Sequence, residues 1–332
     1  MTPANQTDLL GALLKEVSRS FYLTLRVLPA AIRQQISLAY LLARATDTIA
    51  DTEVVPRQSR LELLAEMREV GSNLPVGETF LSRLGPAFGS RQECRSYGEA
   101  TLLQRLDDCF SLLRQLDHGD QTLIRQLLHT IISGQIFDLE RFPGNALTAD
   151  ELDRYTYMVA GCVGEFWTKM CQAHLPGMAA LKVEEGICFG KGLQLVNILR
   201  DMPKDLRIGR CYLPVSEPQV LLDAKNFTTV EHIYRQWLDT AAEHLDAGWR
   251  YTLTIPADMK RLRLACVWPI WIGLKTIARL RRANPLDPTQ RVKVSRAEVY
   301  WIMLESALLA GNDAALDEVY QRLRAATSSA RL

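Results

Sequence analysis

The sequence lacks the features that mark a disulfide-bonded, zinc-binding or membrane-spanning protein. Its seven cysteines are widely scattered and include no Cys-x-x-Cys pair, which argues against a disulfide framework and a structural zinc site. The first residues lack the charged and apolar regions of a signal peptide. No apolar run reaches about 18 residues, so we expect no spanning helix. These absences predict a reduced cytoplasmic protein whose only membrane contact would be peripheral, at the inner surface.

The sequence also lacks an excess of either charge, and strand-like alternation is nearly absent. Lys and Arg number 39 against 38 Asp and Glu, which argues against nucleic acid as a partner. Hydrophobic residues make up 48%, enough for a large core, and they recur with helical periodicity. No solenoid repeat or long linker divides the chain. We therefore expect an all-α protein with a single helical domain over residues 1–332.

One apolar helical run is crossed by a stripe of polar residues. Tyr40, Arg44, Asp47 and Asp51 follow one another at helical offsets, and at roughly 100° per residue they share one face of a helix. Buried charges must be paired or bound to metal. Because two acids one turn apart repel each other, a divalent cation is their natural partner.

A second stripe repeats this arrangement. Gln194, Asn197, Asp201 and Asp205 also cut through an apolar run. Two facing carboxylate helices would form a cavity that holds Mg²⁺ and, through it, a diphosphate. Either stripe alone could be a solvated face or a structural ion pair, but the match between them favours the metal site. Pro203 predicts a kink or a helix end before Asp205, because its ring clashes with a carbonyl one turn earlier.

Two glycines stand one turn apart in the helix predicted for about 149–174. Gly161 and Gly164 each cost about 1 kcal/mol in a helix interior, so their presence needs a reason. Close approach of another helix and contact with a ligand explain the pair equally well.

Four segments together resemble the squalene/phytoene synthase family. They are 18–21, 47–51, Tyr155 with 159–164, and 194–201, and the resemblance extends from about residue 15 to 215. It implies an isoprenoid synthase fold around a central cavity. It also implies an enzyme that joins two prenyl diphosphates head to head with Mg²⁺, as a transferase of isoprenoid biosynthesis.

The resemblance and the chemistry of the two stripes assign the site residues. The metal ligands would be Asp47, Asp51, Asp201 and Asp205. The catalytic residues would be Tyr40, Arg44, Tyr155 and Arg200. The substrate contacts would be Arg19, Ser20, Phe21, Gly161, Gly164, Gln194, Asn197 and Arg210. The arginines among these residues could donate charge-assisted hydrogen bonds to the phosphate oxygens of a diphosphate.

Within the family, the sequence looks most like a bacterial squalene synthase. The Asp-Thr-x-x-Asp form of 47–51 and the segments 265–269 and 291–294 resemble enzymes that reduce presqualene diphosphate with NADPH. Residues 255–297 hold ten Lys or Arg and two Asp, a bias that suits NADPH phosphates, with Lys293 as the candidate contact, or simply solvated helix faces. One departure is Ala265, where the resemblance predicts an aromatic residue.

The sequence leaves two alternative functions open. The first is a non-reductive head-to-head synthase that makes phytoene, dehydrosqualene or presqualene diphosphate. The second is a non-catalytic assembly or scaffold relative, which we disfavour because all four acids are present. A chain-elongating prenyltransferase or a terpene cyclase would usually carry Asp at position 48, which is Thr in this sequence, so we disfavour both. As partners we expect prenyl diphosphates, no nucleic acid, a membrane surface for product release, and no second subunit.

Overall fold

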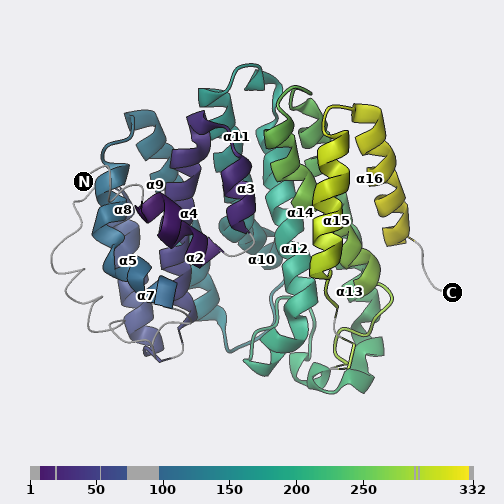
Figure 1. Ribbon diagram of the computed structural model, residues 1–332. Coiled ribbons are helices and arrows are strands. Elements are labelled where there is room, and N and C mark those ends of the chain that lie inside the picture. Colours follow the sequence, from purple (N-terminus) through teal and green to yellow (C-terminus); the bar gives the residue numbers. More distant parts are fainter. Residues whose placement is uncertain are drawn as a thin grey trace. The chain divides into compact units, whose positions relative to one another are not determined.

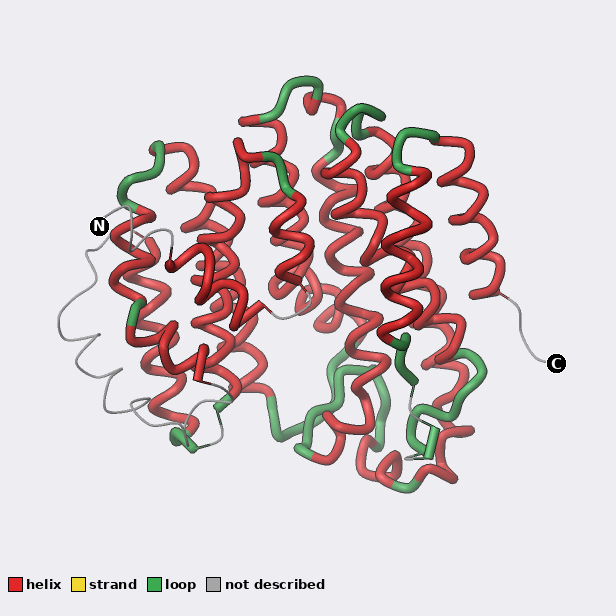
Figure 2. The backbone as a smooth tube through the Cα atoms, viewed as in Figure 1, coloured by secondary structure: helices red, strands yellow, loops and turns green. Residues whose placement is uncertain are grey.

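Helices account for all the regular structure that is described. The computed structural model describes residues 8–18, 21–52, 54–72, 97–287, 289–290 and 292–328. Within these ranges no residue lies in a strand, as Figure 2 shows. The all-α prediction is therefore confirmed. None of the helices in the described ranges is long and apolar enough to cross a membrane.

The chain divides into two compact units. Unit 1 comprises Met1–Glu140 and Lys169–Leu175, and unit 2 comprises Arg141–Thr168 and Pro176–Leu332. Each unit buries a core of its own. The organisation as a single domain stays a prediction.

Unit 1 is built around one long helix, α4 (Ala30–Asp51). This helix packs against α-helices and a π-helix of the same unit, and its buried residues are mainly Leu, Ile and Ala. Helical periodicity predicts a single helix over about 91–117, but within the described residues a turn at Arg105 interrupts it. The other elements of unit 1 are a π-helix (Leu9–Leu13), α2 (Leu14–Ser18), α3 (Phe21–Val27), α5 (Arg57–Ser72), α7 (Tyr97–Gln104), α8 (Leu106–Leu113) and, up to the unit boundary, α9 (His118–Arg141) (Figure 1).

Unit 2 is built around α12 (Val183–Arg207), which packs along α13 (Phe227–Thr254). Helical periodicity around the second stripe predicts a helix over about 178–202, which is wrong at both ends: Met178–Ala180 form a separate 3-10 turn, and α12 continues past residue 202. The other elements of unit 2 are α10 (Ala149–Thr156), a π-helix (Tyr157–Gly161), α11 (Cys162–His174) up to the unit boundary, two 3-10 turns (Pro218–Leu222 and Ala224–Asn226), α14 (Lys260–Leu280), α15 (Arg296–Leu309) and α16 (Asp313–Ser328).

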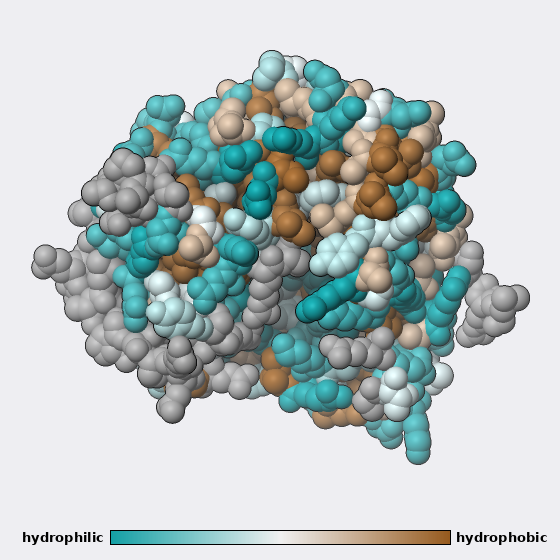
Figure 3. All heavy atoms as spheres, in the orientation of Figure 1, coloured by the Kyte–Doolittle hydropathy of each residue, from teal (hydrophilic) through white to brown (hydrophobic). Residues whose placement is uncertain are grey.

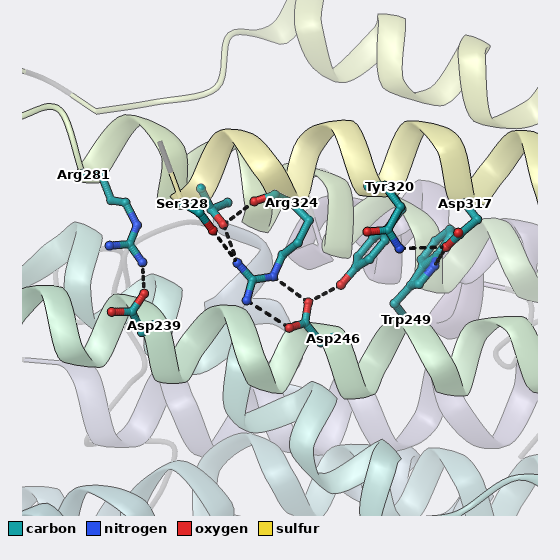
Figure 4. A network of polar contacts seen from close by, with 10 residues as sticks. Asp239, Asp246, Trp249, Arg281, Asp317, Tyr320, Arg324 and Ser328 are labelled. Atoms are coloured by element: carbon teal, nitrogen blue, oxygen red, sulfur yellow. Dashed lines mark hydrogen bonds and ion pairs between the residues drawn. The ribbon is translucent and has the colours of Figure 1, made fainter. Parts of the chain in front are cut away.

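Polar contacts hold the last helix, α16, against α13. Arg324 makes two hydrogen bonds to Asp246, at 2.7 and 3.0 Å, and Tyr320 donates to the same carboxylate (Figure 4). Tyr320 also stacks on Trp249, with ring centroids 4.5 Å apart, and the Trp249 indole donates to Asp317 at 2.7 Å. Burial and the hydrogen bond to Asp246 raise the pKa of the Tyr320 phenol, which keeps it protonated as a donor. The C-terminal helix is thus fixed by side chains that satisfy one another.

Candidate active site

The first polar stripe lies on α4, as predicted. Tyr40, Arg44, Asp47 and Asp51 are all partly exposed, whereas most of the side chains between them are buried. The Asp47 side chain is 48% exposed. The stripe is therefore the solvent-reaching edge of a helix that is otherwise packed into unit 1.

Arg44 is held between two carboxylates. Its guanidinium donates a hydrogen bond to Glu99 on α7, and it lies 3.9 Å from Asp47 one turn along α4. Burial disfavours the charged form of Arg44, but the carboxylates of Glu99 and Asp47 outweigh it, and the net pKa is raised. Glu99 is itself only 2% exposed. Arg44 is therefore a fixed positive charge beside the exposed carboxylate of Asp47.

Gln135 on α9 contacts Asp47 and, like Glu99, was not predicted as a site residue from the sequence. Its amide donates at 2.7 Å to the Asp47 carboxylate and at 3.0 Å to the Thr46 hydroxyl. Gln135 is 8% exposed, so this bond forms in a largely dry environment. A polar amide in the apolar run around Ile131 and Ile132 was the available signal, although nothing in the sequence placed it beside Asp47.

The remaining predicted site residues of unit 1 are Arg19, Ser20, Phe21 and Tyr40. Arg19 and Ser20 lie outside the described residues, and Phe21 begins α3. The Tyr40 hydroxyl lies 3.4 Å from the carbonyl oxygen of Val17 on α2. Tyr40 is thus tied to the segment that leads into the Ser18–Phe21 motif.

The second polar stripe lies on α12 in unit 2. Arg200 makes a two-pronged hydrogen bond to Asp201, at 2.8 and 2.6 Å. This hydrogen bond raises the pKa of Arg200, and the charges of Asp201 and Asp205 raise it further. Burial of the guanidinium lowers the pKa, but by less. The Asp201 side chain is still 46% exposed. Of the other residues in this stripe, Asn197 is exposed, and Gln194 and Asp205 are partly exposed.

Pro203 does not end α12, so of the two outcomes expected from the sequence, a kink or a helix end, the helix end is wrong and the kink stays a prediction. The helix continues to Arg207 and carries Asp205 in its last turn. A proline at this position removes the backbone donor to the carbonyl of Leu199. The Tyr234 hydroxyl of α13 replaces it, donating to the Leu199 oxygen at 3.0 Å inside the core. Burial raises the pKa of the Tyr234 phenol, so it remains a donor.

Replacing Tyr234 by phenylalanine should reduce stability by about 1–3 kcal/mol, because the buried Leu199 carbonyl would lose its donor. Urea unfolding measures the loss. In a Pro203→Ala background the backbone N–H returns, and the same Tyr234→Phe change should then cost little. Equal losses in both backgrounds would show that the hydroxyl is not the substitute for the missing amide.

The end of α12 has a regular glycine cap. Gly209 adopts φ +76°, which favours glycine, and its N–H donates to Leu206 at 3.1 Å. The N–H of Arg210 reaches back to the carbonyl of Asp205 at 2.8 Å. These two bonds form a Schellman motif. The motif places the predicted substrate residue Arg210 directly after the turn that carries Asp205.

Tyr155 is buried among aromatic side chains of unit 2. Its ring stacks on Tyr212 with centroids 5.1 Å apart, and Tyr212 meets Phe142 edge-on at 5.2 Å. The helix of Tyr155 begins with a capping box formed by Thr148 and Glu151, which their spacing of three residues in the sequence predicts. Tyr155 is thus a buried residue of an aromatic cluster, and its catalytic role stays a prediction.

The glycine pair at 161 and 164 lies against α12. A Cβ on Gly164 would lie 1.9 Å from the carbonyl oxygen of Gly186, and one on Gly190 would lie 2.2 Å from that of Ala160. Gly161 ends a single π-helical turn, a feature frequent at functional sites. Close approach of another helix, one of the two explanations for the pair, is observed at Gly164, where the backbone of α12 leaves no room for a side chain. Contact of either glycine with substrate stays a prediction.

The residues named for the reductive step lie in unit 2. Lys293 is exposed in the segment before α15, and its carbonyl oxygen accepts a hydrogen bond from Arg279. Its side chain is therefore accessible to an anionic ligand while its backbone is held. Ala265 is buried in α14, one turn before Pro269.

The donors of both stripes suit Mg²⁺. Within the described ranges, no three His, Cys, Asp or Glu side chains come together as a metal cage. Mg²⁺ does not need one, because it binds through one or two carboxylates together with waters and substrate phosphates. About half of the side-chain surface of Asp47 and Asp201 is exposed, so their oxygens are accessible to a hydrated cation.

The chain belongs to the squalene/phytoene synthase family, whose model matches residues 14–298. A phytoene synthase from Arthrospira platensis is 26% identical over 289 residues, which cover 82% of each protein. A presqualene diphosphate synthase from Zymomonas mobilis subsp. mobilis is 32% identical over 201 residues, which cover 59% of this chain and 56% of that protein.

A solved structure of TcSQS with the ligand BPH1237 is similar over 99% of this chain and 94% of its own, with a TM-score of 0.77 and 19% identity. This likeness confirms the predicted isoprenoid synthase fold. The protein is accordingly an enzyme, a prenyltransferase that condenses prenyl diphosphates head to head.

Proposed function

We propose that the enzyme joins two farnesyl diphosphates to presqualene diphosphate and reduces that intermediate to squalene with NADPH. The observation that carries the proposal is the pair of carboxylate stripes on α4 and α12, each with an accessible aspartate beside a fixed arginine. An allylic diphosphate ionises once its leaving group is neutralised. Mg²⁺ held by Asp47, Asp51, Asp201 and Asp205 would supply that neutralisation.

The chain's own residues would bind, orient and shield the substrate. Arg44 and Arg200 are charged and held in place by their carboxylate partners, so they can donate to phosphate oxygens without reorganising. The apolar residues that flank both stripes would shield a carbocation from water, which would otherwise capture it. Tyr40 and Tyr155 would lie near the reacting carbons and orient a proton transfer, with the released diphosphate as the base.

The reductive step is supported by the resemblance of 47–51 and 291–294 to squalene synthases and by the basic stretch 255–297. Lys293 presents an exposed ammonium group that fits a phosphate of NADPH. The alternative favoured by a specific finding is a synthase that stops at presqualene diphosphate, since one relative carries that name.

The test is to identify the product made from farnesyl diphosphate and Mg²⁺ with and without NADPH. We expect squalene when NADPH is present and presqualene diphosphate when it is absent. The same product under both conditions would show that the enzyme is a non-reductive synthase. Parallel reactions with geranylgeranyl diphosphate should give a lower rate, and a higher one would identify a C20 enzyme.

The variant Lys293→Ala should raise the KM for NADPH about tenfold and let presqualene diphosphate accumulate, because one charge-assisted contact is lost. The rate of farnesyl diphosphate consumption should stay unchanged. Arg282→Ala is the matched control, since Arg282 is an exposed cation of the same basic stretch. An unchanged KM for NADPH in both variants would assign the basic stretch to solvation alone.

A further inference from the structure

The outer face of α15 carries a continuous apolar stripe. Tyr300, Trp301, Leu304 and Leu308 are 65%, 61%, 54% and 78% exposed. Their spacing places them on one side of the helix. Figure 3 shows brown, apolar spheres and paler ones gathered on this face of unit 2, over α15. Large apolar side chains grouped in this way mark an interaction surface, whereas singly scattered ones do not.

The stripe is the outer side of a helix that is already docked. On the opposite side of α15, Ile302 and Ser306 are buried, and the Trp268 indole of α14 donates to the Ser306 hydroxyl at 3.0 Å. The capping box of Ser295 and Glu298 fixes the first turn. The exposed residues are therefore displayed by a rigid helix.

The charges around the stripe favour an anionic surface. The acids of α15 are neutralised, because Glu298 pairs with Arg279 and Glu305 pairs with Arg322. The hydrogen bond from Arg279 holds the pKa of Glu298 at about 2, so this pairing persists at neutral pH. Cations lie at both ends of the stripe: Arg296 is exposed in the first turn of α15, and the exposed side chain of Lys260 lies beside Gly311, just after the helix.

We propose that this face docks on the surface of a lipid bilayer that contains anionic lipid. Leucines would enter the acyl boundary, Tyr300 and Trp301 would sit at the headgroup level with their polar tips in water, and Arg296 and Lys260 would contact lipid phosphates. An apolar stripe with aromatic residues and a basic rim is the pattern of a helix that lies in the plane of the interface. The inference rests on the surface of unit 2 and does not require the proposed reductive step.

Vesicle co-sedimentation of the full-length protein tests the inference without any turnover. The probes are vesicles of phosphatidylcholine alone and of phosphatidylcholine with about one third phosphatidylglycerol. We expect the wild type to sediment with the anionic vesicles and to be released as salt rises from 0.1 to about 1 M. The double variant Trp301→Gln, Leu308→Gln should bind at least about tenfold more weakly, because two apolar side chains no longer leave water.

The matched control is Leu222→Gln, an exposed leucine (62%) in a 3-10 turn of the same unit that lies outside the stripe. It should bind like the wild type, and all variants should keep the wild-type melting temperature. Arg296→Gln with Lys260→Gln should weaken binding to the anionic vesicles alone.

Three outcomes would overturn the inference. The wild type could stay in the supernatant with both vesicle types, or the stripe variant could sediment like the wild type. The third is a wild-type dimer in analytical ultracentrifugation that the stripe variant converts to a monomer, with no lipid binding by either. That result would assign the face to a second copy of the chain.

Discussion

Replacing Asp47 or Asp201 by asparagine should lower turnover of farnesyl diphosphate about 100-fold or more, with no change in helix content. Each substitution removes one negative charge from a cluster that we propose binds diphosphate through Mg²⁺. Asparagine keeps the size of the side chain and an oxygen that can accept the 2.7 Å hydrogen bond from Gln135 to residue 47. The loss would therefore be chemical, because the surrounding packing is retained.

Steady-state rates at several Mg²⁺ concentrations, with circular dichroism as the folding check, measure this effect. Glu184→Gln is the matched control, since Glu184 is an exposed acid in the first turn of the same helix as Asp201. It should retain nearly full activity. Near-normal rates in both aspartate variants would rule out the two-cluster proposal, whereas loss in only one would restrict the metal to that helix.

Gly164→Ala should destabilise the protein by about 3 kcal/mol, an overpacking loss at the upper end of the usual range. The added Cβ would lie 1.9 Å from the Gly186 carbonyl oxygen and 2.5 Å from its carbon. Both atoms belong to the backbone of α12, so relief requires that α11 and α12 separate. The better helix propensity of alanine, worth about 1 kcal/mol, offsets only part of the cost.

Gly161→Ala provides the internal comparison, and thermal melting of both variants measures the difference. At Gly161 the nearest atoms are side-chain carbons of Lys191 and Tyr157 at 3.1 Å, which can shift. The loss there should stay below about 1 kcal/mol. If Gly164→Ala melted like the wild type but bound substrate more weakly, ligand contact would be the reason for this glycine.

Helical periodicity was sufficient to find both polar stripes. An aspartate repeated along an apolar helix is visible in a single segment, because the period of 3.6 residues is a local property. Their side-chain partners were not visible in the same way. Gln135 lies 88 residues from Asp47, and Glu99 lies 55 residues from Arg44. Only the packing of α9 and α7 against α4 brings these pairs together.

The same division explains why α12 does not end at Pro203. Local chemistry predicted a kink or an end for α12, because proline removes a donor and crowds the preceding turn. The tertiary structure supplied the Tyr234 hydroxyl from α13, 35 residues away, and the helix continued. A local rule fails where a distant side chain satisfies the group that the rule leaves unpaired.

By itself, the sequence determined the helical class, the two carboxylate stripes and the capping box at Thr148, because each depends on spacing within one segment. The tertiary structure alone decided which side chains hold Arg44 and Asp47, how α12 passes Pro203, and why Gly164 has no side chain. It also decided which face of α15 is left exposed, since burial depends on neighbours from other parts of the chain.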